Sequence, residues 1–225
     1  MNDIIVQSTA GVTLAGGGGF SLKLLEMALV VAPRLVAADG GADRLLRLGG
    51  EPEAVIGDFD SITAEARRRL AGRLHPIAEQ ATTDFDKALR SIAAPFVLGI
   101  GFSGARLDHS LAVLNGLIRH PGQRCFILGG RDVAFLAPLR LTLRLPVGSR
   151  LSLFPMGVVE GESAGLRWPL QGIGFAPYGM IGTSNEVAAP EVTLQFSAAR
   201  MLVILPRSAL VAALDGFGLS GVHGR

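Results

Sequence analysis

The sequence is poor in cysteine and lysine, and it contains no long uninterrupted apolar run. Its lone cysteine, Cys125, excludes an internal disulfide, and its apolar neighbours indicate a small buried residue in a protein of a reducing compartment. The uncharged stretch 4–22 contains polar residues and four consecutive glycines, so it lacks the roughly 20 mostly apolar residues of a membrane-spanning helix. No basic segment precedes the first apolar residues, as a signal peptide requires. We therefore expect a cytoplasmic protein with no membrane partner.

The sequence also lacks the patterns typical of nucleic-acid binding and of zinc sites. It has one tryptophan and one tyrosine, and its arginines are scattered instead of alternating with aromatic residues as in a stacking platform. The densest basic group, 67–69, lies beside Glu65 in an expected helix and is typical of a solvated helix face. Although the pI is near 9.2, we expect no nucleic-acid partner.

Up to about residue 135, short apolar runs alternate with amphipathic helical patterns. The expected strands are 35–38, 54–56, 96–98 and 125–128. The expected helices are 42–48, a helix that follows the segment 57–61 and continues to Leu74, 84–92 and 110–119. This alternation predicts an α/β fold with a parallel sheet covered on both faces. In such sheets, ligands bind beyond the carboxyl ends of the strands.

From about Leu139 the apolar period changes to two. Apolar and polar residues alternate over 139–145 and again over 192–196, and glycine and proline are frequent. This pattern predicts an antiparallel β-sandwich or barrel. We therefore expect two domains, an α/β domain over 1–138 and a β domain over 139–225.

The segment 57–61 reads GDFDS and directly follows an expected strand. Asp58 and Asp60 could both point toward one ligand, and carboxylate oxygens suit Mg²⁺. Alone, the segment could equally be a turn with a helix cap. Asp39 and Asp84 change this balance, because aspartates gathered at one sheet edge would repel one another without a cation.

A second acidic segment, 83–88, reads TDFDKA and begins an expected helix. Asp84 and Lys87 are three residues apart, so they share one helix face near an end that attracts phosphate. The alternative is a capped helix with a surface ion pair. The chain has only one other lysine, Lys23, and no P-loop pattern.

The segment 99–104 reads GIGFSG and formally matches a dinucleotide-binding fingerprint, so an NADP site is an alternative interpretation. The same loop continues to Arg106, Asp108 and His109. An arginine there offers planar recognition of phosphate, whereas His109 could be either a ligand contact or a packed residue.

In the second half, the only tryptophan, Trp168, could be a core residue or a platform for a ligand. The segment 182–186 gathers hydrogen-bonding side chains, as either a turn or a recognition loop.

Taken in order, these segments resemble the thiamine pyrophosphokinase family. The resemblance rests on short motifs spread over most of the chain: ADGGA at 38–42, GDFDS at 57–61, TDFDKA at 83–88, the glycine loop that ends in RLDH at 106–109, GLRW at 165–168 and TSNE at 183–186. One position departs from the family pattern, because Ala105 stands where the family usually has glycine before the arginine. If that position needs a positive φ, alanine costs about 1 kcal/mol there.

The resemblance implies an α/β domain for ATP, a C-terminal β domain and a homodimer with thiamine bound between subunits. It implies Mg²⁺ held by Asp58, Asp60 and Asp84, which with Arg106 would form the catalytic set. By the same analogy, the residues around ATP are Asp39, Gly40, Gly41, Asp84, Lys87, Arg106, Asp108 and His109, and those around thiamine are Trp168, Thr183, Ser184 and Asn185.

The sequence is therefore interpreted as that of an enzyme, a thiamine diphosphokinase that uses ATP as co-substrate and releases AMP. Two alternatives stay open at this point. One is a non-catalytic nucleotide or thiamine sensor on the same fold, and the other is an NADP-dependent oxidoreductase.

Overall fold

The computed structural model describes residues 3–104 and 106–219, and the chain divides into two compact units. The first unit ends at Gly130 and the second begins at Arg131, so the β-strand Asp132–Leu136 (β9) belongs to the second unit. The boundary expected at residue 138 lies after this strand. Among the described helices, none combines the length and apolar character that a membrane crossing requires.

The first unit alternates strands and helices along the chain. Its strands are β1 (Val6–Gln7), β2 (Val12–Ala15), β3 (Arg34–Ala38), β4 (Ala54–Gly57), β5 (Leu74–Pro76), β6 (Ile92–Ala93), β7 (Val97–Ile100) and β8 (Cys125–Leu128). Its helices are α1 (Leu22–Val31), α2 (Gly41–Arg47), α3 (Ala64–Arg69), α4 (Asp84–Arg90) and α5 (Leu107–Arg119).

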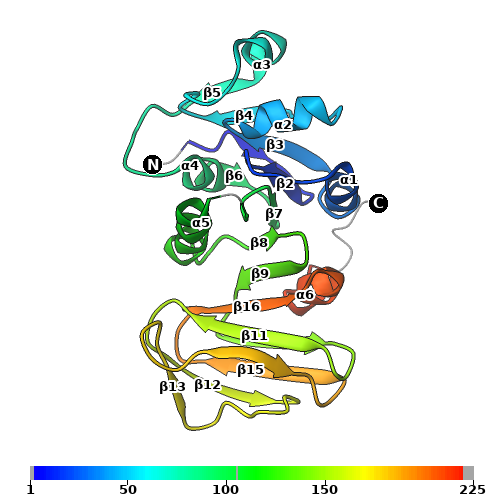
Figure 1. Cartoon of the computed structure of the whole chain (residues 1–225), viewed down its shortest axis with the longest axis vertical. Coiled ribbons are helices and arrows are strands. Elements are labelled where there is room, and N and C mark those ends of the chain that lie inside the picture. The colour runs from blue at the N-terminus through cyan, green and yellow to red at the C-terminus, as the bar shows by residue number, and fades with distance from the viewer. Residues whose placement is uncertain (1–2, 105, 220–225) are drawn as a thin grey trace. The chain divides into compact units, whose positions relative to one another are not determined.

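The strands of the first unit pair in parallel, which confirms the predicted α/β character. β7 pairs with β2 and β8, and β4 pairs with β3 and β5. β2, β4, β7 and β8 are buried along their whole length, as expected for strands covered on both faces. In Figure 1, α4 and α5 lie together on one side of these strands, and α1 lies on the other.

The starts of three helices follow from their capping residues. The side chains of Ser21, Thr63 and Thr83 each accept a backbone N–H from the first turn of α1, α3 and α4. The helix expected to run to Leu74 is shorter than predicted. α3 ends at Arg69, a short 3-10 turn follows, and Leu74 begins β5.

The second unit is built from antiparallel strands and one α-helix among its described residues. The strands are β9, β10 (Arg140–Arg144), β11 (Arg150–Pro155), β12 (Val159–Ala164), β13 (Ile173–Phe175), β14 (Gly182–Glu186), β15 (Glu191–Phe196) and β16 (Met201–Pro206), and the helix is α6 (Leu210–Gly216). One group of strands runs in the order β14-β11-β16-β9, and a separate sheet has the order β10-β15-β12-β13.

Burial in the second unit follows the period of two that the sequence shows. In β10, Leu141 and Leu143 are buried, whereas Arg140, Thr142 and Arg144 are exposed. α6 covers this buried face closely, because a Cβ on Gly216 would lie 3.0 Å from side-chain carbons of both leucines. The alternation therefore identifies the face of the sheet that forms a core.

Candidate functional site

A cleft of about 450 Å³ in the first unit gathers residues that directly follow the parallel strands. Asp39 follows β3, Asp58 follows β4, and glycine segments 16–18 and 101–104 follow β2 and β7. The opposite side is lined by residues from the loop before α4 and from α4 itself, among them Asp84 and Lys87. The cleft therefore occupies the sheet edge at which a ligand was predicted.

Asp39, one of the aspartates that line the cleft, is held in an unusual conformation. It is 2% exposed and has a positive φ of 40°, which few residues other than glycine adopt. The backbone N–H and the hydroxyl of Ser61 both donate to its Oδ2, and its buried Oδ1 has no hydrogen-bond partner among the described residues. Burial raises the pKa of Asp39 above its usual value, although the bonds from Ser61 act in the opposite direction.

The GDFDS loop brings its two carboxylates close together. Phe59, between them, is buried and has a positive φ of 65°. Its ring lies 5.8 Å from the Arg67 guanidinium, which also donates to its carbonyl. The N–H of Asp60 donates to Oδ1 of Asp58 at 3.3 Å. The strained turn is therefore held by the contacts of Phe59 with Arg67 and by the bond from Asp60 to Asp58, as is common for loops that aim functional groups.

Lys87 neutralises part of the negative charge of the cleft's aspartates. Its ammonium lies 2.7 Å from Asp58 and 3.1 Å from Asp84, and its side chain is 1% exposed. Asp84 and Lys87 thus share a face of α4, as predicted from their spacing. Burial alone would lower the pKa of Lys87, but hydrogen bonds to the two carboxylates outweigh it and raise this pKa. The same bond from Lys87 lowers the pKa of Asp58.

The donor set suits a hard cation. One carboxylate oxygen from each of Asp39, Asp58 and Asp60 lies within 4.8 Å of the others. A buried Asp39 oxygen without a partner is the group that a bound cation would satisfy. The family resemblance implies Asp58, Asp60 and Asp84 as metal ligands, and Asp84 lies outside this close group, in contact with Lys87. Asp39 completes the close group and is oriented by Ser61, which the sequence analysis did not single out.

The glycine loop after β7 closes another side of the cleft. Gly101 has a φ of 72°, and a Cβ there would lie 2.7 Å from the carbonyl oxygen of Gly16, so only glycine allows the two loops to approach. Arg106 and His109 line the cleft. Arg106 is bound to Asp108 at 2.6 Å and lowers the pKa of that carboxyl to about 2. Ala105, the departure from the family pattern, lies outside the described residues.

The two glycines after Asp39 differ in their surroundings. Gly40 lines the cleft, where a Cβ would lie 2.9 Å from the Ser61 hydroxyl. Gly41 is buried at the start of α2, and a Cβ there would lie 2.1 Å from the Ala15 carbonyl. Because Gly41 has no side chain, α2 can pack against the end of β2.

The predicted thiamine residues lie in the second unit, on β14 and in the loop after β12. Trp168 is 51% exposed, so it is not a core residue. Asn185 is 7% exposed, and its amide bonds both backbone groups of Trp168, accepting from the N–H at 3.2 Å and donating to the carbonyl at 2.7 Å. Asn185 therefore fixes the tryptophan loop. The guanidinium of Arg167 lies 5.0 Å from the indole ring.

Thr183 and Ser184 are exposed beside Asn185 on β14. Ser184 has a positive φ of 60°, and its N–H donates to the hydroxyl of Ser152 at 3.0 Å. The pairing of β14 with β11 shifts register between Leu151 and Leu153, opposite this residue. Both side chains, Thr183 and Ser184, are accessible from solvent at this irregularity.

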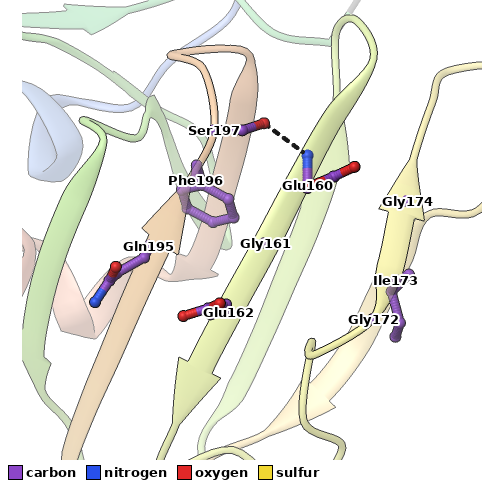
Figure 2. A pocket seen from close by; sticks show the side chains of 9 residues that line it. All are labelled: Glu160, Gly161, Glu162, Gly172, Ile173, Gly174, Gln195, Phe196 and Ser197. Atoms are coloured by element: carbon purple, nitrogen blue, oxygen red, sulfur yellow. Dashed lines mark hydrogen bonds between the residues drawn. The ribbon is translucent and has the colours of Figure 1, made fainter.

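A second cavity, of about 420 Å³, lies on the β10-β15-β12-β13 sheet. Figure 2 shows Glu160 and Glu162 of β12 between Gln195 of β15 and Ile173 of β13, with the Ser197 hydroxyl bonded to the Glu160 N–H at 2.9 Å. Its lining, within the described residues, includes two carboxylates and no basic side chain. This cavity disfavours a phosphorylated ligand and holds none of the residues predicted from the sequence.

Comparison with known proteins places these two sets of residues in one family. A profile described as "Thiamin pyrophosphokinase, catalytic domain" matches residues 26–127, and a second, "Thiamin pyrophosphokinase, vitamin B1 binding domain", matches residues 140–201. The chain belongs to the thiamin pyrophosphokinase family. The catalytic-domain profile spans the aspartates and Lys87 of the cleft, and the B1-binding profile spans Trp168 and Asn185.

Relatives in this family match over most of their length. Thiamine pyrophosphokinase 3 of Oryza sativa subsp. japonica is 27% identical over 214 residues, covering 76% of this chain and 80% of the relative. Thiamin pyrophosphokinase 1 of Caenorhabditis elegans is 26% identical over 191 residues, covering 75% and 77%.

Solved structures share the fold at lower identity. The thiamin pyrophosphokinase of Candida albicans aligns with a TM-score of 0.75 at 15% identity, over 89% of this chain and 93% of that one. The yeast thiamin pyrophosphokinase aligns with a TM-score of 0.73 at 15% identity, over 93% and 94%.

Proposed function

We propose that the chain transfers a diphosphate from ATP to thiamine, giving thiamine diphosphate and AMP. The observation that carries this proposal is the pair of family profiles, matched in order along one chain. The acidic cleft in the first unit and the exposed tryptophan in the second supply the two kinds of group that the reaction needs. Family membership favours catalysis over a sensor or an NADP-dependent oxidoreductase.

In this proposal, Asp58, Asp60 and Asp84 hold Mg²⁺ together with Asp39. The bound ion supplies positive charge that offsets the charge on the phosphoryl oxygens. Lys87 keeps Asp58 ionised, since its hydrogen bond lowers the pKa of that carboxyl, and Ser61 keeps one oxygen of Asp39 turned to the group. The chain thus holds its ligand atoms in place before a substrate arrives.

The remaining cleft residues are proposed to surround ATP. Gly40 and the glycine loops let the backbone approach the nucleotide, and Arg106 offers a planar guanidinium to phosphate oxygens. Asp108 holds that guanidinium at 2.6 Å, and His109, the next residue, lines the cleft. Gly41 contributes by packing α2 against β2.

The thiamine hydroxyl attacks the β-phosphorus of ATP in line with the departing AMP, and its proton passes to an aspartate. The sequence left two candidates, Asp58 and Asp84, and both contact the Lys87 ammonium. The side chain of Asp84 is the more accessible of the two, at 30% against 14% for Asp58. We assign the proton acceptor to Asp84.

Thiamine is proposed to bind against Trp168, Thr183 and Ser184. An indole face attracts both a flat pyrimidine and a cationic thiazolium. Arg167 already lies over the Trp168 ring, so the vitamin takes the opposite face. Asn185 acts through its two bonds to the backbone of Trp168.

We also propose that the chain is a cytoplasmic homodimer with thiamine bound between subunits. The loop 176–181 supports this proposal, because it exposes Tyr178 to 86%, Met180 to 56% and Ile181 to 38%. Large apolar side chains gathered in one exposed loop are typical of an interaction surface.

Incubation with ATP, Mg²⁺ and thiamine, followed by mass analysis of the products, tests the reaction. We expect AMP and thiamine diphosphate in equal amounts. Asp58→Asn is the matched control, and we expect it to lower kcat by about a hundredfold, the usual loss for a group that stabilises transition-state charge. Equal amounts of ADP and thiamine monophosphate would overturn the reaction type, and saturable binding without turnover would favour the sensor.

A further inference from the structure

The loop 77–83 forms one wall of the acidic cleft without having regular secondary structure. It joins β5 to α4 and brings Gln80, Thr82 and Thr83 to the cleft. The amide of Gln80 donates to Oδ2 of Asp58 at 3.2 Å. The loop therefore supplies one of the hydrogen bonds that orient a proposed metal ligand, and its own conformation must be fixed by contacts outside helices and strands.

Arg90, in the last turn of α4, makes those contacts. Its guanidinium donates to the Thr82 hydroxyl at 3.1 Å and to the carboxylate of Glu79 at 3.0 Å. Glu79 in turn accepts the backbone N–H of Ala81 at 3.0 Å and the hydroxyl of Thr82. One side chain thus ties together residues on both sides of Gln80.

Arg90 is itself anchored by a buried carboxylate. Asp86, one helical turn earlier, has a side chain that is 4% exposed and accepts from Arg90 at 3.3 Å. It is also 3.0 Å from the Arg119 guanidinium and 3.1 Å from Nε2 of His120, at the end of α5. Because a buried carboxylate needs such partners, the Arg90 guanidinium has a fixed position between α4 and the loop.

We propose that Arg90 is a positioning residue for the reaction. It does not line the cleft and acts by holding the loop 77–83 so that Gln80 stays bonded to Asp58. This inference rests on the proposed function for its effect on turnover, but the contact between Arg90 and the loop can be measured without substrate. A purely structural role would change the melting temperature of the protein and leave the kinetics well below that temperature unchanged.

The test compares Arg90→Met with Arg119→Met in the full chain. Both variants remove a guanidinium from the same Asp86, but only Arg90 reaches the loop. Without substrate, we expect amide hydrogen exchange over 77–83 to become at least about tenfold faster in Arg90→Met and to stay near wild type in Arg119→Met. Unchanged exchange in Arg90→Met, or equal acceleration in both variants, would overturn the inference whether or not the proposed reaction occurs.

The kinetic part uses Gln80→Ala as a second mutation. We expect Arg90→Met to lower kcat/KM about tenfold, the scale of effect of a small misplacement of a reacting group. In the Gln80→Ala background the same substitution should have little further effect, because its route to Asp58 is already lost. Equal losses in both backgrounds would exclude positioning through Gln80. Should Arg90→Met fail to fold, Arg90→Lys keeps the charge but not the forked contacts, and should give a smaller change in the same direction.

The two proposals can fail separately. If the wild type makes no thiamine diphosphate but the Arg90→Met variant shows faster exchange over 77–83, the proposed function is contradicted and the role of Arg90 in holding the loop is retained. Unchanged turnover in Arg90→Met despite faster exchange over 77–83 would retain the proposed function and overturn the positioning role of Arg90 in the reaction.

Discussion

Asp39 is a single residue whose arrangement suits a ligand and lowers the stability of the folded apo protein. Its backbone has a positive φ, one oxygen is bound by Ser61, and the other is buried without a partner among the described residues. Burial and the neighbouring Asp84 and Asp60 carboxylates both raise its pKa. Such a group destabilises the apo protein and is stabilised when a cation binds.

Replacement of Asp39 by asparagine should therefore raise the melting temperature of the apo protein. Asparagine can still accept from Ser61 and tolerates the positive φ, but it carries no charge. At neutral pH we expect a rise of about 3 °C, the shift that roughly 1 kcal/mol produces in a chain of this length. Differential scanning calorimetry in chelator measures it.

The pH dependence of this difference has a definite sign. Because the folded-state pKa of Asp39 is raised, its penalty is complete above that pKa and disappears as the pH falls toward the ordinary value of 3.8. The two melting temperatures should thus converge in acid. Added Mg²⁺ should raise the wild-type melting temperature more than that of the variant. A lower melting temperature for Asp39→Asn in chelator at every pH would contradict this account.

At the scale of elements, α4 combines two functions in seven residues. Asp84 and Lys87 face the cleft, whereas Asp86 and Arg90 face the loop and the end of α5. The sequence predicted the first pair from its spacing of three residues. It did not predict that Lys87 is buried or that Arg90 holds a loop, because both depend on contacts between residues far apart in the chain.

The sequence predicted the buried parallel strands well, because strands such as 54–57 and 125–128 are continuous apolar runs between turn residues. It missed β5, whose residues Leu74, His75 and Pro76 carry no periodic pattern and are defined only by pairing with β4. Similarly, Leu139 continues the alternation of β10 in sequence but lies outside the strand and is 54% exposed. Local pattern identifies elements, and pairing partners decide their ends.

The tryptophan loop gives the prediction at this scale. Trp168→Phe should raise the KM for thiamine severalfold, because a smaller ring loses part of a stacking and cation–π contribution of about 0.5–2 kcal/mol. The KM for ATP and the melting temperature should stay near wild type, since the side chain is half-exposed. Asn185→Ala is a useful comparison, because it frees the same loop while leaving the indole present.

The intrinsic fluorescence of this sole tryptophan gives an independent measurement, and thiamine should quench it saturably. Unquenched fluorescence at thiamine concentrations that saturate turnover would remove Trp168 from the site.

At the scale of the whole molecule, the chain separates its predicted substrate sites into two compact units. The acidic cleft lies wholly in the first unit, and Trp168, Thr183 and Ser184 lie in the second. A diphosphate transfer needs both substrates in one site. The proposed homodimer is one way to bring such residues together, and the exposed loop 176–181 is the surface that we assign to it.

Tyr178→Ser combined with Met180→Ser should weaken this dimer. Sedimentation velocity should show a shift toward monomer, with a loss of thiamine quenching at dilutions where the wild type still responds. Val147→Ser removes an apolar side chain that is 61% exposed elsewhere in the second unit and serves as the control. A wild-type chain that sediments as a monomer while turning over would exclude the dimer as a requirement.

The placement of the two lysines has a practical consequence for handling the protein. Lys23 lies exposed on α1, whereas the Lys87 ammonium is buried between two carboxylates of the cleft. Of the two lysines, amine-reactive dyes and activated supports will therefore modify Lys23 in the native state and spare Lys87 in the cleft. A chain tethered through Lys23 is held from its α1 side, and this attachment leaves the acidic cleft intact.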